Sequence, residues 1–363
     1  MKKIHSILMA AVLVAGSLTS CSSSDDLESK ASALTPSDKE IKFTVGDLTR
    51  GTAFTGDATA LGTAGYQVFA YTHETPTIYI NRVVYPGGTA YWPTTGSLDF
   101  LALYPKTLTA TEVAPTAWNS FSYTAPTAID DQVDLMAATA ENKSSSDGDV
   151  SLEFSHLLSQ ISIQAKAATN LEVTVKSVEF HNVKTTGTFN GTALSAGTDL
   201  NNYAISFDEK TLDSDGTVAD LTGNKVLLLV PQTTTAWPTE AGYAESIDYN
   251  DTDENGTKGS YIKVELKVKN GAAYVLGAAD NYATVYFPLA INWVKQKHYT
   301  YTLIFGASDS DTGDGFGYDG EIGDTDTEGS GTTEEVDLPG QTSITFSTTV
   351  SDWEDVDPTE IKF

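Results

Sequence analysis

The stretch Ile262-Lys263-Val264-Glu265-Leu266-Lys267-Val268 alternates apolar and charged residues and is followed closely by Asn270-Gly271. Successive side chains of a β-strand point to opposite faces of a sheet, so this alternation predicts a strand with one buried face. Asn-Gly is typical of tight hairpin turns and predicts a return strand directly afterwards. Leu171, Val173 and Val175 alternate in the same way, and Asn190-Gly191 predicts another tight turn. The sequence therefore predicts an all-β fold.

The first half of the chain carries the same period of two, in residues 66–70 and 78–80. Residues 98–104 are apolar at almost every position and end at Pro105, which predicts a strand buried on both faces. Regular short strands separated by turn residues favour β-sandwiches. One short helix is expected, around His156 to Gln160.

The N-terminus has the features of a lipoprotein export signal. Lys2 and Lys3 precede a short apolar run that ends at Leu18-Thr19-Ser20-Cys21. This arrangement predicts a signal peptide over residues 1–20 and lipid attachment to the thiol of Cys21, with the outer membrane lipid as a partner of the precursor. The run is too short for a transmembrane helix, and a plain signal peptide with a chance cysteine is the alternative.

Charge and cysteine usage exclude several classes of protein. The formal net charge is −28, with 49 acidic and 21 basic residues, so the surface repels phosphate backbones and nucleic-acid binding is not expected. Cys21 is the single cysteine of the chain, so no internal disulfide can form.

Composition also predicts the domain organisation. We expect an N-terminal β-sandwich over residues 51–165 and a C-terminal β-sandwich over residues 166–307. Residues 308–340 are rich in Asp, Glu, Gly and Thr without one Lys or Arg, which predicts a flexible acidic linker. Alternation resumes in residues 341–363, at Ile344, Phe346, Thr348 and Val350.

The motifs for ligand binding or catalysis match their patterns only in part. Residues 315–320 have the spacing of a dinucleotide-binding loop but lie among acidic residues, which would repel a pyrophosphate. Residues 251–256 match half of a calcium loop, yet Ile262 stands where the bidentate Glu belongs, so adventitious calcium is the most that is expected. His156 follows Phe154 and is interpreted as a packed histidine rather than a base. No cofactor, metal site or enzymatic activity is predicted.

Several segments together resemble the fimbrillin family, the lipoprotein-derived pilins of Bacteroidales. The acidic tether after Cys21 is similar to surface-export signals of Bacteroidetes lipoproteins. The segments that carry the resemblance are Tyr66-Gln67-Val68-Phe69-Ala70-Tyr71, Tyr91-Trp92-Pro93, Leu98 to Pro105, Asp134-Leu135-Met136-Ala137, Leu152 to His156, Val230-Pro231-Gln232, Tyr299-Thr300-Tyr301 and Val350-Ser351-Asp352-Trp353.

The resemblance implies two transthyretin-like β-sandwiches in tandem and assembly into cell-surface fimbriae by strand donation. It also implies an arginine-specific protease that removes an N-terminal strand, and other fimbrial subunits as partners. The family includes subunits that act as shaft, anchor or tip, and the sequence does not separate these roles.

Physical chemistry agrees with strand donation, because a groove left open before assembly would invite aggregation. Ile41, Phe43 and Val45 alternate shortly before Arg50 and could fill such a groove temporarily. Cleavage between Arg50 and Gly51 would remove residues 1–50 and with them this strand. The C-terminal series from Ile344 to Val350 is the expected donor strand. The alternatives are a lipid-anchored surface protein that binds glycans or acts as an adhesin without polymerising, and a glycosidase.

Overall fold

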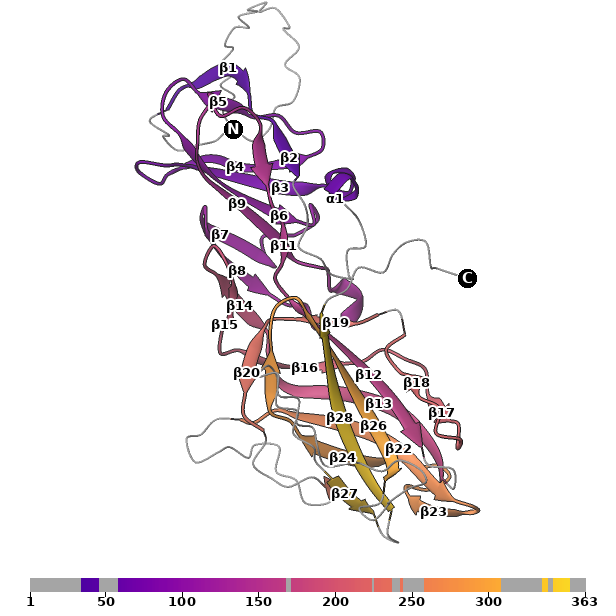
Figure 1. Cartoon of the computed structure of the whole chain (residues 1–363). Helices are drawn as coiled ribbons and strands as arrows, with labels where there is room; N and C mark the ends of the chain where they lie inside the picture. Colours follow the sequence, from indigo (N-terminus) through magenta and orange to yellow (C-terminus); the bar gives the residue numbers. More distant parts are fainter. Residues whose placement is uncertain are drawn as a thin grey trace, which may run out of the picture.

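The computed structural model describes residues 34–45, 58–167, 171–223, 225–236, 242–243, 258–307, 335–338 and 342–352. The regular structure of these residues is almost entirely β-strand, together with the helix α1 (Ala58–Ala64) and the 3-10 turn η1 (Ile129–Asp131). Figure 1 shows the sheets following one another along a long axis, from β1 at one end to β23 and β27 at the other. The predicted all-β class is confirmed. Neither described helix has the length and apolar character needed to cross a bilayer.

A five-stranded antiparallel sheet forms the centre of the N-terminal half. Its order is β11 (Ser155–His156), β9 (Met136–Lys143), β6 (Leu98–Tyr104), β3 (Tyr66–Thr72) and β4 (Ile78–Tyr85). Alternate residues of β6 enter two different apolar clusters: Phe100 belongs to one, and Leu101 and Leu103 belong to the other. The strand predicted to be buried on both faces is therefore confirmed.

These two clusters are called the N-terminal core and the main core below. The N-terminal core gathers Ile41, Val68, Trp92, Phe100 and Phe154 with their neighbours on one face of the five-stranded sheet. The main core begins on the opposite face and continues through the rest of the described molecule. The central sheet thus separates a small core from a large one.

A four-stranded antiparallel sheet joins the two halves of the sequence. Its order is β15 (Leu194–Ala196), β14 (Thr186–Phe189), β8 (Ser120–Thr124) and β7 (Val113–Ala117). The rings of Phe121 and Phe189 stack across it, with their centroids 4.8 Å apart. The β14–β15 hairpin turns at the predicted Asn190-Gly191, where Gly191 has a φ of +96° that favours glycine. This predicted turn is confirmed.

The C-terminal half is built on two larger sheets. The six-stranded sheet has the order β18 (Ala219–Asp220), β12 (Ser159–Ala167), β26 (Lys297–Ala307), β28 (Thr342–Asp352) and β27 (Glu335–Leu338), with β19 (Leu227–Leu229) also on β12. The seven-stranded sheet has the order β16 (Leu200–Ala204), β13 (Leu171–Lys184), β22 (Tyr261–Asn270), β24 (Ala283–Pro288) and β21 (Gly242–Tyr243), with β17 (Lys210–Leu212) on β13 and β23 (Ala273–Leu276) on β22. A separate pair joins β20 (Gln232–Thr234) to β25 (Ile291–Trp293).

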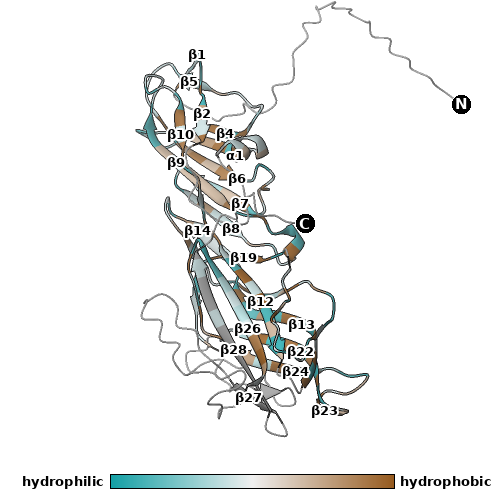
Figure 2. Ribbon diagram, turned by 45° about the vertical axis from the view of Figure 1, so that its right-hand side comes forward, coloured by the Kyte–Doolittle hydropathy of each residue, from teal (hydrophilic) through white to brown (hydrophobic). Residues whose placement is uncertain are grey.

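Both large sheets bury alternate residues in the main core. In β22 the residues Ile262, Val264, Leu266 and Val268 are fully buried, as the alternation predicts, and β22 returns as β23 after Gly271. Figure 2 shows the corresponding change between apolar and polar residues along the strands of this half. The predicted strand and its hairpin are confirmed.

Three details of the predicted organisation differ from the structure. Position 165, the expected domain boundary, lies inside β12, which pairs with β26 from Gln160 to Ala167. The short helix expected around residues 156–160 is wrong, because His156 ends β11 and Ser159 begins β12, with only Leu157 and Leu158 between them. A short apolar run fits either period, and here pairing with neighbouring strands decides. Glu335–Leu338, predicted as linker, forms β27, antiparallel to β28.

Candidate assembly site

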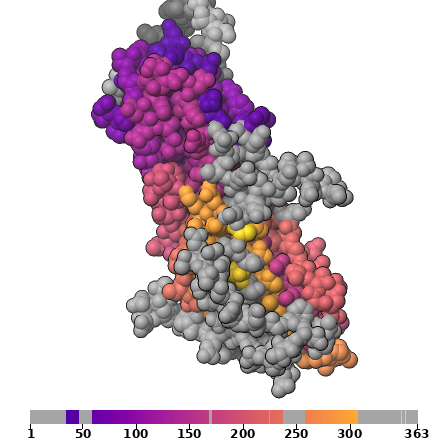
Figure 3. All heavy atoms as spheres, in the orientation of Figure 1, coloured from indigo at the N-terminus to yellow at the C-terminus, as the bar shows by residue number. Residues whose placement is uncertain are grey.

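The first described residues, 34–45, are called the N-terminal segment, and they cover the N-terminal core. Its strand β1 (Pro36–Glu40) pairs antiparallel with β5 (Tyr91–Pro93), and its strand β2 (Phe43–Val45) pairs parallel with β10 (Val150–Leu152). Figure 3 shows the start of the described chain, in indigo, on the outer surface of this end of the molecule. The segment is therefore an outer layer rather than part of the central sheet.

Ile41 lies between the two short strands and anchors the segment. Its side chain is 1% exposed, and its amide donates to the Ala90 carbonyl at 2.8 Å. The amide of Val150 donates to the Lys42 carbonyl at 2.8 Å, and the amide of Thr94 donates to the Thr35 carbonyl at the same distance. Main-chain pairing with two short strands and one fully buried side chain thus hold the segment in place.

Phe43 adds an aromatic contact to this anchor. Its ring meets Tyr85 edge to face at 5.0 Å between centroids and meets Phe100 in the same manner at 5.4 Å. Val45 is half-buried and packs against the same core. The predicted series Ile41, Phe43 and Val45 therefore does face an apolar surface. The aromatic residues beneath it were not predicted, because they come from separate strands with no shared motif.

The segment covers an apolar surface that changes the pKa of the Tyr85 hydroxyl. Burial, together with the nearby Tyr66 and the Glu40 carboxylate, raises the pKa of the Tyr85 hydroxyl well above its usual value. The hydroxyl oxygen is buried without a hydrogen-bond partner. Removal of the segment would bring water to this group.

The predicted processing and lipidation residues lie outside the described part of the chain. Cys21 precedes it, and Arg50 and Gly51 fall between β2 and α1. Arg82, the other arginine of the chain, lies in β4, an edge strand of the five-stranded sheet, and its side chain is exposed.

The predicted donor residues Ile344, Phe346, Thr348 and Val350 lie in β28. They stand opposite four buried residues of β26 in an antiparallel ladder, namely Phe305, Leu303, Tyr301 and Tyr299. The strand is flanked by β27 on its other side. In this structure the expected donor strand completes a sheet of its own chain.

The four histidines of the described residues, whose side chains are the best suited to acid–base chemistry, lie in four separate places. His156 is 1% exposed, and its Nδ1 lies 2.7 Å from the equally buried Asp134 carboxylate, so the packed histidine is confirmed. His181 stacks on Tyr261 at 4.6 Å, and Nε2 of His298 lies 2.9 Å from the Ser162 hydroxyl. His73 contacts Asp99. No two of the four share a site.

The side chains of Trp92 and Trp118 are packed against the two cores rather than exposed. Trp92 is 1% exposed, and Trp118 is partly buried against the main core. Trp237 lies outside the described residues, and Tyr243 lies in β21.

Comparison with known proteins decides the family. The fimbrillin-like family model matches residues 37–353, from the N-terminal segment to the end of β28. The chain belongs to the fimbrillin-like family. No curated protein matches it.

Solved structures of similar proteins come from Bacteroides and Parabacteroides. A fimbrial protein from Bacteroides vulgatus shares 15% identity with this fimbrillin-like protein, over 74% of this chain and 95% of that one, with a TM-score of 0.49. A candidate cell adhesion protein from Bacteroides uniformis shares 17% identity over 88% and 100%, with a TM-score of 0.41. Another from Parabacteroides distasonis shares 14% over 87% and 98%, with a TM-score of 0.46.

Membership of the fimbrillin-like family supports a role in fimbriae. In this fimbrillin-like protein the family match includes both ends that the sequence singled out, the N-terminal segment and β28.

Proposed function

We propose that this protein is a structural or accessory subunit of fimbriae that polymerises by donor-strand exchange. It is exported as an outer membrane lipoprotein through Cys21, and an arginine-specific protease cuts between Arg50 and Gly51. Release of the N-terminal segment then opens a groove over the N-terminal core. A strand from the C-terminal end of a neighbouring subunit fills that groove.

One observation carries the proposal: the N-terminal segment covers a core but belongs to no large sheet. Ile41 and Phe43 fill space above Trp92 and Phe100, while the main-chain pairing is limited to the short strands β5 and β10. A segment with much apolar contact and little pairing can be replaced by a longer strand that offers more of both.

The donor must place apolar side chains at every second position, as Ile41, Phe43 and Val45 do. Ile344, Phe346 and Val350 have this spacing, with Thr348 between them. Either the ladder between β28 and β26 must open before β28 can be donated, or a segment adjoining β28 must be the donor. Fimbrial family membership supports this assignment of partners.

A structural rather than enzymatic role is part of the proposal. Three of the four candidate histidines have buried or half-buried rings engaged with Asp134, Tyr261 or Ser162. Such contacts suit packing more than proton transfer to a substrate.

The test compares Arg50→Ala with the matched control Arg82→Ala, since these are the two arginines of the chain. The first variant should keep its N-terminus and remain a monomer, whereas the second should be cut and polymerise like the wild type. Fibres of normal length from Arg50→Ala that retain residues 21–50 would contradict the mechanism. Absence of fibres from the wild type as well as from Arg50→Ala would favour the adhesin that does not polymerise.

Cysteine pairing tests the identity of the donor. The proposed cut after Arg50 removes Cys21, the single cysteine of the chain, so introduced cysteines have no native competitor in the mature chain. Ser151→Cys on β10, where Ser151 is exposed opposite Thr44, is combined in turn with cysteine at Thr345, Ser347 or Thr349. At least one combination should give a ladder of disulfide-linked subunits in fibres. Absence of every ladder from assembled fibres would show that another strand is donated.

A further inference from the structure

A histidine and two carboxylates meet at one end of the five-stranded sheet. His73 follows β3, Asp99 lies in β6 and Glu141 lies in β9, and these three strands are neighbours in the sheet. One ligand atom from each residue lies within 4.8 Å of the other two. Asp99 is buried, His73 is half-buried and Glu141 is exposed, so the cluster opens to solvent on one side.

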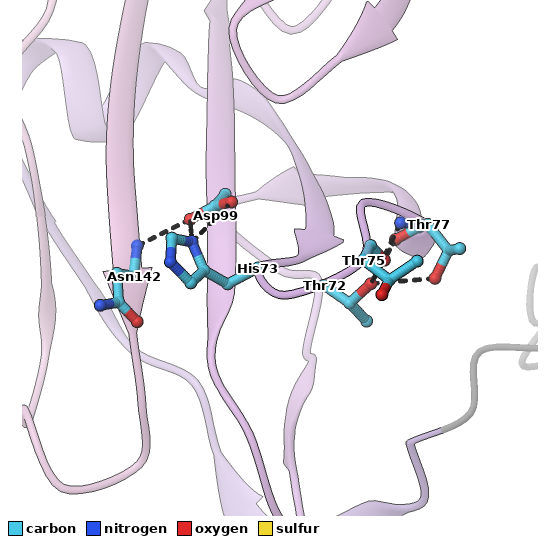
Figure 4. Close-up of polar contacts among 6 residues, drawn as sticks. All are labelled: Thr72, His73, Thr75, Thr77, Asp99 and Asn142. Carbon is cyan, nitrogen blue, oxygen red and sulfur yellow. Dashed lines mark hydrogen bonds and ion pairs between the residues drawn. The ribbon is translucent and has the colours of Figure 1, made fainter.

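A β-bulge creates this arrangement. Leu98 is opposite Lys143 and Phe100 is opposite Ala140, so both Glu141 and Asn142 of β9 face the single residue Asp99. Asn142 takes a φ of +52°, and its amide donates to Oδ1 of Asp99 at 2.7 Å, as Figure 4 shows. Bulges redirect side chains and are frequent beside functional sites. Here the extra residue brings Glu141 to the cluster and fixes the Asp99 carboxylate.

Hydrogen bonds also fix the backbone at His73 and the turn that follows it. The amide of His73 donates to the Ser97 carbonyl at 3.0 Å. The Thr72 hydroxyl accepts the Thr77 amide at 3.0 Å and lies 2.9 Å from the Thr77 hydroxyl, which closes the turn after His73 (Figure 4). Two of the three ligand groups are thus positioned before any ligand binds.

We propose that His73, Asp99 and Glu141 form a binding site for a divalent first-row transition-metal ion. One imidazole nitrogen and two carboxylate oxygens form a donor set that suits zinc or manganese better than calcium, which prefers oxygen alone. Nδ1 of His73 is the ligand nitrogen, and Nε2 carries the proton when the metal is bound.

The distances fit such an ion. Metal bonds of about 2.1 Å place two ligand atoms about 3.4 Å apart in the tetrahedral geometry of zinc and about 3.0 Å apart in an octahedral geometry. Nδ1 of His73 is 2.9 Å from Oδ1 of Asp99, so an octahedral ion fits directly and zinc requires the two atoms to separate by about 0.5 Å. Glu141 is exposed and has to move its carboxylate only slightly. The amide of Asn142 donates a hydrogen bond to the Asp99 carboxylate and so orients it, as hydrogen-bond partners of metal ligands commonly do.

A second pairing of a histidine with a half-buried acid provides a matched control. His181 lies 2.8 Å from the Glu179 carboxylate, but the ammonium group of Lys263 lies 3.6 Å from the same carboxylate. A cation of the protein already stands where a metal would have to bind. His181→Ala should therefore leave metal binding unchanged.

The experiment is a calorimetric titration of the purified protein with Zn²⁺ and Mn²⁺, with Ca²⁺ and Mg²⁺ for comparison. Zinc should bind with one saturable site that is lost, or weakened at least about tenfold, in His73→Ala and in Glu141→Gln. Glu141→Gln keeps the shape of an exposed side chain, so it should fold normally even if His73→Ala does not. Binding to manganese should be weaker than to zinc.

Three outcomes would overturn the site. Zinc binding that is equal in the wild type, Glu141→Gln and His73→Ala would place the metal elsewhere on this acidic chain. A preference for calcium that is insensitive to His73→Ala would indicate carboxylates alone. Complete absence of saturable binding would leave His73 and Asp99 as a structural ion pair.

Discussion

At the residue scale, Gly65 joins α1 to β3 in a conformation that other residues rarely adopt. Its φ is +96°, and a Cβ at this position would lie 2.5 Å from the main-chain oxygen of Tyr85. Gly65→Ala should therefore lower the free energy of unfolding by about 3 kcal/mol, since the left-handed conformation costs about 1–2 kcal/mol and the clash adds a similar amount. Denaturation by urea measures the change.

Gly87 separates these two contributions. It also has a positive φ, of +114°, but a Cβ there meets nothing within 4 Å. Gly87→Ala should cost only the conformational part, about 1–2 kcal/mol. Equal losses in the two variants would mean that Tyr85 moves away easily.

His298 makes stability depend on pH. Burial lowers its pKa below 6.5, against a weaker opposite effect of Asp220, and Nε2 lies 2.9 Å from the Ser162 hydroxyl. The unfolded chain then binds the proton more readily than the folded chain, so stability is full above about pH 6.5 and falls as the pH decreases toward the folded pKa. The slope should reach at most about 1.4 kcal/mol per pH unit for this group.

His298→Gln should reduce the loss between about pH 6.5 and about pH 5. His181, whose pKa burial also lowers, contributes in the same range, so the double variant with His181→Gln should have the flattest profile. Urea denaturation at several pH values provides the measurement. An unchanged slope in the double variant would show that other groups control the acid range.

The sequence predicts the burial of some residues but not which residues they contact. The burial of His156 could be predicted from its apolar neighbours, but its partner Asp134 could not, because it lies on a different segment. The cluster of His73, Asp99 and Glu141 was not predicted either, since its members come from three strands and depend on a bulge. Its one local signal was Asp99, the charged residue within the apolar stretch 98–104.

At the scale of elements, the N-terminal segment should come loose when its anchor is lost. Ile41→Asp places a carboxylate at a buried position, and the cost favours release of the segment over a buried charge. Hydrogen exchange should then accelerate at the amides of Thr94 and Val150, which donate to this segment, while amides in β13 and β22 keep their protection.

Asp38→Ala is the matched control, because Asp38 is exposed on β1. It should leave the exchange rates at Thr94 and Val150 unchanged. Equal protection of these amides in Ile41→Asp and in the wild type would show that the segment is held by something other than its apolar side chain.

The strand β22 was predicted from its clean alternation, because one burial pattern fixes one register. The strand β6 was predicted from its continuous apolar run, which is typical of a strand buried on both faces. The helix expected at residues 156–160 failed because Leu157, Leu158 and Ile161 are buried among strands, and their spacing does not distinguish the two structures. No change of sheet occurs at position 165, because β12 continues past it and pairs with β26 up to Ala167. This pairing joins residues far apart in sequence, so local composition does not reveal it.

At the scale of the whole molecule, charge opposes assembly. Residues 1–50 contain six basic residues (Lys2, Lys3, Lys30, Lys39, Lys42 and Arg50) and six acidic ones (Asp25, Asp26, Glu28, Asp38, Glu40 and Asp47), so the protein keeps a net charge of −28 after the proposed cut. Subunits of equal negative charge repel one another, and salt screens this repulsion. Raising the salt concentration should therefore accelerate polymerisation of the cut protein, as followed by light scattering. Slower polymerisation in salt would indicate that ion pairs between subunits drive assembly.

The most direct measurement is the mass and N-terminal sequence of the chains inside native fibres. Chains that have lost the N-terminal segment should begin at Gly51 and carry no lipid, while chains in the membrane fraction should begin at the acylated Cys21. Fibres built mainly from chains that begin at Cys21 and retain Ile41 and Phe43 would contradict strand replacement over the N-terminal core.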